Sequence, residues 1–318
     1  MKTHYSLPQL GWNNFFQQQL SLEEYETCTP ARVFAQERSM LQLINEHGAL
    51  SLPVTAAMGP MTVGDWVLLD RADCFHRALD RSSLFIRKAA GAKNRRQLIS
   101  ANVDTVFLVS SMNQDFNLNR LERYLALTAE ADVESVVVLT KADCCKNPQE
   151  FKSRSHALGE SLDVIAVNSL DRNSVNQLTP WCQLGKTVAF LGSSGVGKST
   201  LINTLLDEAV QRTQSIRQDD DKGRHTTTSR SMHLLPSGAL LLDTPGMREL
   251  QLVDCEQGVD QTFSEISDLA RRCRFSDCHH QDEPDCAVRE AIESGEVDER
   301  RLRSYRKLMK EQAFNSAT

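Results

Sequence analysis

The sequence of 318 residues lacks any run of about 18 apolar residues, the length that a membrane-spanning helix needs. Its first residues, MKTHYSLPQLGW, also lack the apolar segment of a secretory signal. We therefore expect a cytoplasmic protein with no membrane partner. The nine cysteines are odd in number and dispersed, and several lie beside histidine. This pattern favours reduced thiols and a metal site over a disulfide framework.

The sequence also lacks the excess of positive charge that non-specific binding to nucleic acid requires. The formal net charge is −6 and the isoelectric point is near 5.8, so no broad positive field surrounds the protein. Contact with RNA would have to be local. Two stretches without acidic residues could supply it, Arg87–Arg96 and Arg300–Lys310. Charge alone does not distinguish RNA contact from a solvated face.

The length of the chain predicts two or three domains, and the spacing of its apolar residues divides it into regions. After an N-terminal extension, residues 1–30, residues 31–98 carry short β-like runs punctuated by Gly and Pro, which predict a small barrel or sandwich ending in a basic linker. In residues 99–260, strand-like runs alternate with helix-like stretches, the pattern of a mostly parallel α/β sheet. Residues 261–318 are helical, charged and cysteine-containing.

A phosphate-binding loop is predicted where GSSGVGKST lies between the apolar TVAFL and the helical STLINTLL. Its glycines let the backbone fold around phosphates, and amides at the helix start face the anions. We expect Lys198 to neutralise phosphate charge and take part in catalysis, and the Ser199 hydroxyl to ligate magnesium. The loop comprises Gly192, Ser193, Ser194, Gly195, Val196, Gly197, Lys198, Ser199 and Thr200.

Two downstream segments are candidates to complete the magnesium site. ALLLDTPG places Asp243 at the end of a buried strand, where it could hold magnesium through water, and the Gly246 amide could approach the γ-phosphate. The preceding GRHTTTSR offers threonines as further ligands, among them Thr227 and Thr228. Which threonine binds stays open, and a Thr-rich loop also forms ordinary turn hydrogen bonds.

The segment TKAD, which begins at Thr140, precedes the phosphate loop, the reverse of the usual order in GTP-binding proteins. Asp143 could accept hydrogen bonds from guanine N1 and the exocyclic amine, which adenine does not offer, while the Lys141 stem packs over the base. After the next strand-like run, Asn168 and Ser169 could place a backbone amide near the guanine oxygen. Because ligands of open α/β sheets bind across several strand ends, this order predicts one GTP site in a circularly permuted domain.

A metal site is predicted in CRFSDCHHQDEPDC, which contains Cys273, Cys278, His279, His280 and Cys286. Three thiolates and one imidazole suit a closed tetrahedral zinc site, and such an ion would stabilise a small helical domain. A catalytic zinc is disfavoured because four protein ligands leave no open position. We therefore expect one structural zinc ion per chain.

The sequence resembles the RsgA (YjeQ) family of small ribosomal subunit biogenesis GTPases in three features. These are the β-rich start, the motif order TKAD, VNS, GSSGVGKST, GRHTTT and DTPG, and the final Cys-x4-Cys-x-His-x5-Cys. The resemblance extends from about Ala31 to the C-terminal helix. It implies an OB-fold, a permuted P-loop GTPase domain and a zinc-binding domain. It also implies a monomer that binds GTP and GDP, acts in late maturation of the small subunit and is stimulated by it. The resemblance selects His280 as the zinc ligand and favours contact of the basic stretches with ribosomal RNA.

Several positions depart from the usual GTPase patterns. Thr140 stands where Asn is usual, which removes an amide that contacts the base or braces the phosphate loop, so we expect weaker affinity but preserved guanine selectivity. Ser169 belongs to VNS, where Ser-Ala is commoner. Met247 cannot orient water as a glutamine would, which makes His225 the catalytic candidate, although an exposed histidine without a role is the alternative. A GTP-dependent checkpoint module, or a GTPase for another RNA partner, also remains open.

Overall fold

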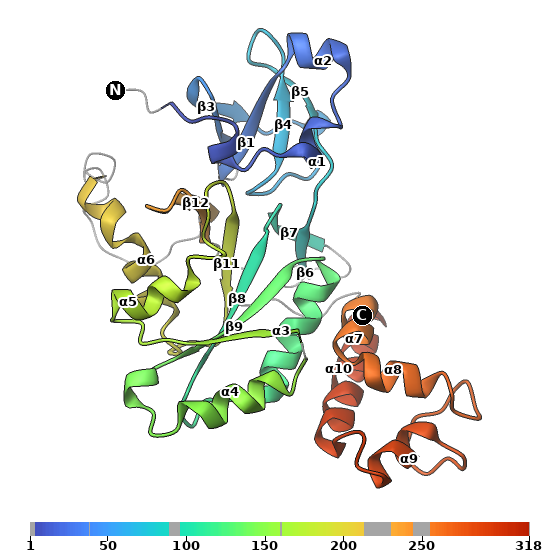
Figure 1. Ribbon diagram of the computed structural model, residues 1–318. Helices are drawn as coiled ribbons and strands as arrows, with labels where there is room; N and C mark the ends of the chain where they lie inside the picture. Colours follow the sequence, from blue (N-terminus) through green and yellow to red (C-terminus); the bar gives the residue numbers. More distant parts are fainter. Residues whose placement is uncertain are drawn as a thin grey trace.

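The computed structural model describes residues 4–37, 39–88, 96–159, 161–212, 230–243 and 255–317. Three parts follow one another along the chain: a small barrel, an α/β part and a helical C-terminal part (Figure 1). Within the described ranges, no helix combines the length and apolar character needed to cross a membrane.

The barrel is built around β1, which pairs antiparallel with β2 and β4, while β3 and β5 extend the two edges. The bounds are β1 Thr29–Gln36, β2 Met40–Asn45, β3 Gly48–Pro53, β4 Trp66–Leu69 and β5 Phe75–Ala78. On β4, Val67 and Leu69 pack into the barrel core, whereas Trp66 and Leu68 pack against the N-terminal extension. Side chains of a strand alternate between its faces, so covering both faces buries all four.

The N-terminal extension is a packed part of the fold, although its sequence is largely polar. It contains the short helices α1 Asn14–Gln17 and α2 Leu22–Thr27. Leu10 and Phe16 are fully buried against the outside of the barrel, where Phe16 and Trp66 have ring centroids 5.7 Å apart. These contacts give the barrel a second hydrophobic core on its outer face.

A buried arginine ties the extension and the barrel to the α/β part. The guanidinium of Arg32 donates to the carbonyl oxygens of Leu10 at 2.6 Å and Asn102 at 3.0 Å, and to Thr187 Oγ1 at 2.9 Å. Burial lowers the pKa of Arg32 to about 10. Because buried polar groups are costly unless hydrogen-bonded, these bonds hold the barrel in one position against the strand that starts at Thr187.

A hairpin of β6 Leu84–Lys88 and β7 Arg96–Ala101 connects the barrel to the α/β part. The first basic stretch is therefore partly strand: Arg87 donates to Gln97 Oε1 across the hairpin at 2.9 Å. Its central residues, 89–95, lie outside the described residues. The domain boundary expected between residues 98 and 99 falls inside β7.

Five parallel strands in the order β10-β9-β8-β11-β13 form the centre of the α/β part. The edge strand β12 pairs antiparallel with both β13 and β1, so the sheet continues into the barrel. From β8 the chain passes outward to β9 and β10 and then returns to β11, so the strand order reverses between β8 and β11. The bounds are β8 Thr105–Ser111, β9 Glu134–Thr140, β10 Asp163–Ala166, β11 Thr187–Leu191, β12 Arg230–Leu234 and β13 Leu240–Asp243.

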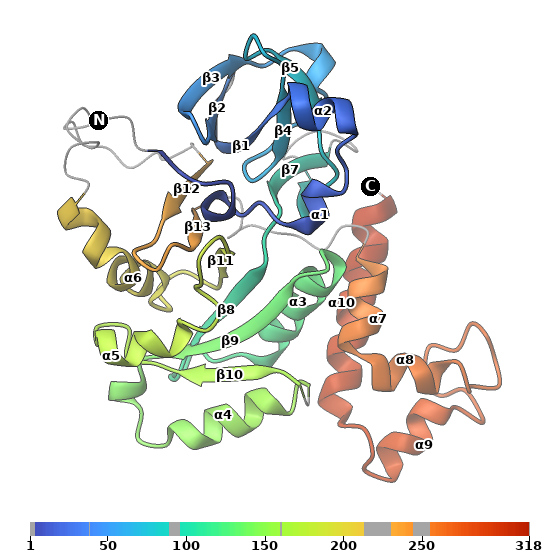
Figure 2. The same ribbon diagram turned by 45° about the horizontal axis from the view of Figure 1, so that its top comes forward.

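Helices cover both faces of this sheet, with α3 and α6 on opposite sides in Figure 2. On β8, Val106 and Leu108 join a core with α3 and α4, whereas Phe107 and Val109 join a core with α5 and α6. The helices are α3 Leu118–Glu130, α4 Pro148–His156, α5 Arg172–Val175 and α6 Lys198–Arg212. Double coverage explains why the strands read as continuous apolar runs, and it confirms the predicted α/β architecture.

The C-terminal part packs its helices α7 and α10 along α3 (Figure 1). Its helices are α7 Glu256–Thr262, α8 Ser264–Ala270, α9 Ala287–Glu293 and α10 Glu299–Ala317. The fully buried Glu122 of α3 accepts hydrogen bonds from Arg300 at 3.0 Å and Arg301 at 3.1 Å. Two arginines of the second basic stretch thus neutralise an internal carboxylate. The basic side chains of that stretch that remain exposed are Arg303, Lys307 and Lys310.

Candidate functional site

The phosphate-loop segment connects β11 to α6, the strand-loop-helix context expected from the sequence. A β-carbon at Gly192 would lie 2.5 Å from the Val109 carbonyl oxygen, so only glycine fits beside β8. Gly197 has φ +97°, a conformation that side chains rarely adopt. Ser194 and Ser199 are exposed at the surface of the loop and of the first helical turn. The loop lies where the strand order reverses, the usual ligand site of an open α/β sheet.

The side chain of Lys198 folds back over this loop. Its Nζ donates to the Gly192 carbonyl oxygen at 2.6 Å and also to that of Ser193, and the residue is 6% exposed. The ammonium is thereby held inside the loop at the start of α6, where helix amides and a positive charge together attract phosphate.

TKAD contacts the phosphate loop directly despite lying far upstream in the chain. The Thr140 hydroxyl at the end of β9 donates to the Val196 carbonyl oxygen at 2.5 Å, and Lys141 Nζ donates to that of Gly195 at 3.2 Å. The Thr140 hydroxyl therefore contacts the phosphate loop at the position where GTPases usually use the side-chain amide of an asparagine. TKAD and the phosphate loop therefore lie together, although they are far apart in the sequence.

Asp143 lies in the short helix η3 Ala142–Cys144 and is exposed at the same edge of the sheet. Its carboxylate accepts a hydrogen bond from the Cys144 thiol at 3.2 Å. That bond, reinforced by the negative charge of Asp143, raises the pKa of Cys144. The exposed carboxylate is accessible to a base bound beside Lys141.

The VNS segment joins the same edge from β10. The Ala142 amide donates to the Val167 carbonyl oxygen at 3.2 Å, which links the two base-side loops. The Asn168 amide donates to Ser174 Oγ at 2.9 Å, and Thr204 of α6 donates to the Ser169 carbonyl oxygen at 2.7 Å. Asn168 and Ser169 are therefore held between α5 and the helix that follows the phosphate loop.

Two residues that contact the phosphate loop, Arg120 and Asp115, were not predicted from the sequence. Arg120 donates to Ser193 Oγ at 2.8 Å, and Ser193 Oγ donates to Asp115 Oδ2 at 2.9 Å. The hydrogen bond from Ser193, with help from Arg120, lowers the pKa of Asp115. Both follow the carboxyl end of β8, and that position was the available signal, since such sites collect residues from several strand ends.

Some of the predicted site residues are not described. His225, Thr227, Thr228 and Gly246 lie outside the described residues, as does Met247. Asp243 ends β13 next to the phosphate-loop strand, but its side chain is outside the described set as well.

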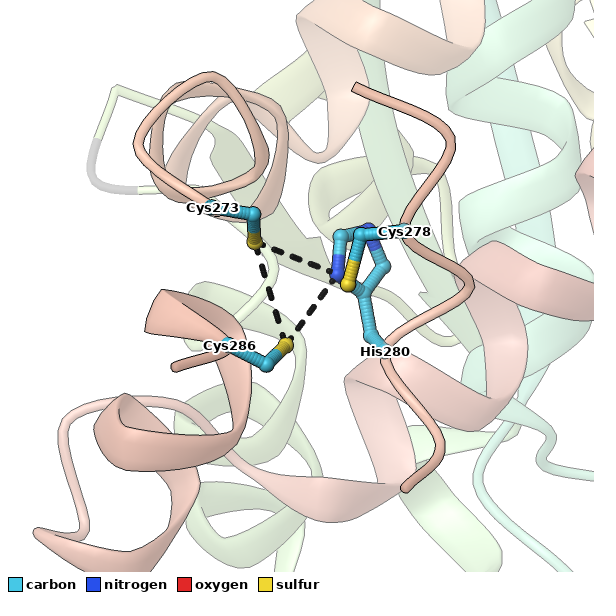
Figure 3. A group of neighbouring side chains, drawn as sticks. All are labelled: Cys273, Cys278, His280 and Cys286. Carbon is cyan, nitrogen blue, oxygen red and sulfur yellow. Dashed lines mark hydrogen bonds between the residues drawn. The ribbon is translucent and has the colours of Figure 1, made fainter. Parts of the chain in front are cut away.

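The cysteine-histidine cluster lies in the C-terminal part, where Cys273, Cys278, His280 and Cys286 point toward one another (Figure 3). Their ligand atoms all lie within 4.8 Å of one another. Cys273 Sγ is 3.8 Å from Cys286 Sγ and 3.6 Å from His280 Nδ1. A tetrahedral ion with metal–sulfur bonds of about 2.3 Å requires sulfurs about 3.8 Å apart, so the group fits a metal ion.

The surroundings favour His280 over His279 in this cluster. Burial lowers the pKa of His280, which keeps the imidazole neutral, as a ligand must be. Arg306 of α10 donates to the His280 carbonyl oxygen and fixes the loop, whereas His279 is exposed. Desolvation, followed by the neighbouring thiols, raises the pKa of Cys278 to about 11, and a bound cation would reverse that effect.

Comparison with known proteins agrees with this geometry. The model of the RsgA GTPase family matches residues 78–253. A Vibrio parahaemolyticus protein named small ribosomal subunit biogenesis GTPase RsgA 2 is 57% identical over 318 residues, covering 100% of this chain and 89% of the relative. A Mesorhizobium japonicum protein named small ribosomal subunit biogenesis GTPase RsgA is 44% identical over 317 residues, covering 98% and 91%.

Two solved structures share the fold. YjeQ from Thermotoga maritima matches with a TM-score of 0.65 at 23% identity, covering 90% of this chain and 99% of that one. YloQ, described as a circularly permuted GTPase, matches with a TM-score of 0.62 at 22% identity, covering 93% and 99%. The permuted arrangement expected from the motif order is confirmed.

Proposed function

This chain belongs to the RsgA GTPase family, and on that premise we propose that it hydrolyses GTP as a factor in late maturation of the small ribosomal subunit. The observation that carries the proposal is the contact between TKAD and the phosphate loop, through Thr140 to Val196 and Lys141 to Gly195. This contact supports the proposal, because a carboxylate of TKAD that reads guanine would then lie at the same edge of the sheet as a phosphate-binding loop.

In the proposed site, guanine lies beside Lys141 with its N1 and amino group on Asp143. The phosphates follow the loop toward Lys198, which neutralises their charge and stabilises the transition state. The backbone amides of the loop supply further donors, since the helix start faces the same anions. His225 is our candidate for orienting the attacking water.

Two metal ions belong to this proposal. Magnesium would bind with GTP through the exposed Ser199, a threonine of GRHTTT and, through water, Asp243. Zinc would be held by the three cysteines and His280, because thiolate and imidazole ligands within tetrahedral reach suit that ion. Zinc there would supply structural stability, and four protein ligands leave no position for substrate.

We propose that the barrel, the GTPase domain and the metal-binding domain work together on ribosomal RNA. The exposed side chains of Arg303, Lys307 and Lys310 lie along α10 at spacings of four and three residues, so they share one face of the helix. That spacing suits contact with a phosphate backbone. We further propose that the protein acts as a monomer in the cytoplasm and that the subunit stimulates its turnover.

Replacing Asp143 with asparagine tests the guanine assignment. The substitution turns one acceptor into a donor, so GTP binding should weaken by about 1 to 3 kcal/mol, whereas xanthosine triphosphate binding should strengthen. Equilibrium binding of both nucleotides to the full chain measures the change. Asp163→Asn, at the opposite end of a neighbouring strand, is the matched control and should bind GTP normally. Equal binding of GTP by the Asp143 variant and the parent would remove Asp143 from the base site.

A further inference from the structure

The side chain of Ser169 is anomalous within the base-side loops. The residue is 7% exposed, and its Oγ is buried without a hydrogen-bond partner among the residues that the structure describes. Its backbone is fixed, because Thr204 Oγ1 donates to its carbonyl oxygen at 2.7 Å. A buried hydroxyl that makes no hydrogen bond destabilises the free protein, so this arrangement calls for an explanation.

The position of this hydroxyl relates it to the nucleotide. Ser169 Oγ and Thr140 Oγ1 both face Gly197 of the phosphate loop, each 3.6 Å from the place that a β-carbon of Gly197 would take. The Thr140 hydroxyl already donates to the Val196 carbonyl oxygen. Of these two hydroxyls, only that of Ser169 has no acceptor among the described residues, so its proton is available to a ligand.

Guanine offers an acceptor for that proton. Asp143 accepts from N1 and the exocyclic amine, which leaves the N7 and O6 acceptors on another edge of the base. A backbone amide at Ser169 suits O6, and N7 then needs a separate donor. The sequence departs from the usual GTPase pattern at the same two positions, with Thr140 in place of an amide side chain and Ser169 in place of alanine.

We propose that the Ser169 hydroxyl donates a hydrogen bond to N7 of the bound guanine. The inference rests on the proposed GTP site and assigns a specificity role to a side chain where the sequence offered only a backbone contact. A serine hydroxyl moves between staggered positions by rotation about a single bond, so it reaches the base without backbone movement. Nucleotide binding then gives a hydrogen-bond partner to a buried hydroxyl that has none among the described residues.

The test compares GDP with 7-deaza-GDP, in which a carbon replaces N7. The full chain should bind GDP about 3- to 10-fold more tightly than 7-deaza-GDP, the range for one net hydrogen bond. Ser169→Ala should bind GDP more weakly by a similar factor and should no longer distinguish the two nucleotides. Without nucleotide, this variant should unfold at the same temperature as the parent or higher, because an unpaired buried hydroxyl has been removed.

Ser174→Ala is the matched control, since Ser174 Oγ accepts the Asn168 amide and acts only on the loop backbone. This variant should weaken both nucleotides equally. The proposal is overturned if Ser169→Ala still discriminates between the nucleotides, or if Ser174→Ala loses discrimination to the same extent. If the parent protein binds neither GDP nor GTP, the proposed function fails together with this inference, a result that differs from intact binding without discrimination.

Discussion

Lys198→Ala should lower the turnover of GTP by at least about 100-fold, the usual loss when one preorganised charge is removed from a transition state. Lys198 is 6% exposed, and its ammonium donates to the carbonyl oxygens of Gly192 and Ser193 in the loop. Because the Lys198 side chain is already ordered, it loses little further conformational entropy when phosphate enters the loop. Steady-state phosphate release at saturating GTP measures the effect.

Lys146→Ala is the control for this prediction, because Lys146 is exposed beyond the TKAD loop and has no proposed contact with phosphate. It should hydrolyse GTP at the rate of the parent. Lys198→Arg keeps the charge but changes its geometry, and should remain strongly impaired. If Lys198→Ala turned over GTP within about 2-fold of the parent, the phosphate loop would not be the catalytic site.

Loss of the metal ion should have the second large effect, on the C-terminal part of the fold. Cys286 is 3% exposed and caps α9, whereas Cys273 follows α8, so the cluster connects two helices through four side chains. Structural zinc contributes about 10 to 16 kcal/mol of apparent binding energy in small zinc domains. Cys286→Ala should therefore lose zinc and expose α8, α9 and α10 to proteolysis.

Elemental analysis and limited proteolysis of the full chain test this prediction together. The parent should carry close to one zinc ion per chain, and a strong chelator should reproduce the cleavage pattern of the variant. Cys74→Ala, which removes an exposed thiol of the barrel, should retain both zinc and resistance. Unchanged resistance after complete removal of the metal would show that the cluster does not stabilise these helices.

The sequence was most informative where a function depends on neighbouring residues. The phosphate loop needs glycines and a lysine at fixed spacing before a helix, and the metal cluster needs its thiols and imidazole within a short segment. The order of TKAD and the phosphate loop further predicted the permuted fold, because only a reversing sheet brings both segments to one edge.

What the sequence did not reveal depends on contacts between distant residues. Arg300 read as part of a basic surface, yet its guanidinium pairs with Glu122, 178 positions away. Two further hydrogen bonds, from Arg120 to Ser193 and from Thr140 to Val196, likewise depend on the order of the strands in the sheet. A local pattern cannot show whether a charge will be buried, because burial is decided by the partner that the fold provides.

The most direct test of the account is the rate of GTP hydrolysis by the full chain, measured with and without purified small ribosomal subunits. We expect selective hydrolysis of GTP over ATP and a rise in turnover of at least about 10-fold with small subunits, because the proposed partner completes the catalytic site. Large subunits at the same concentration should have no effect. Turnover that is the same with and without small subunits would contradict the account.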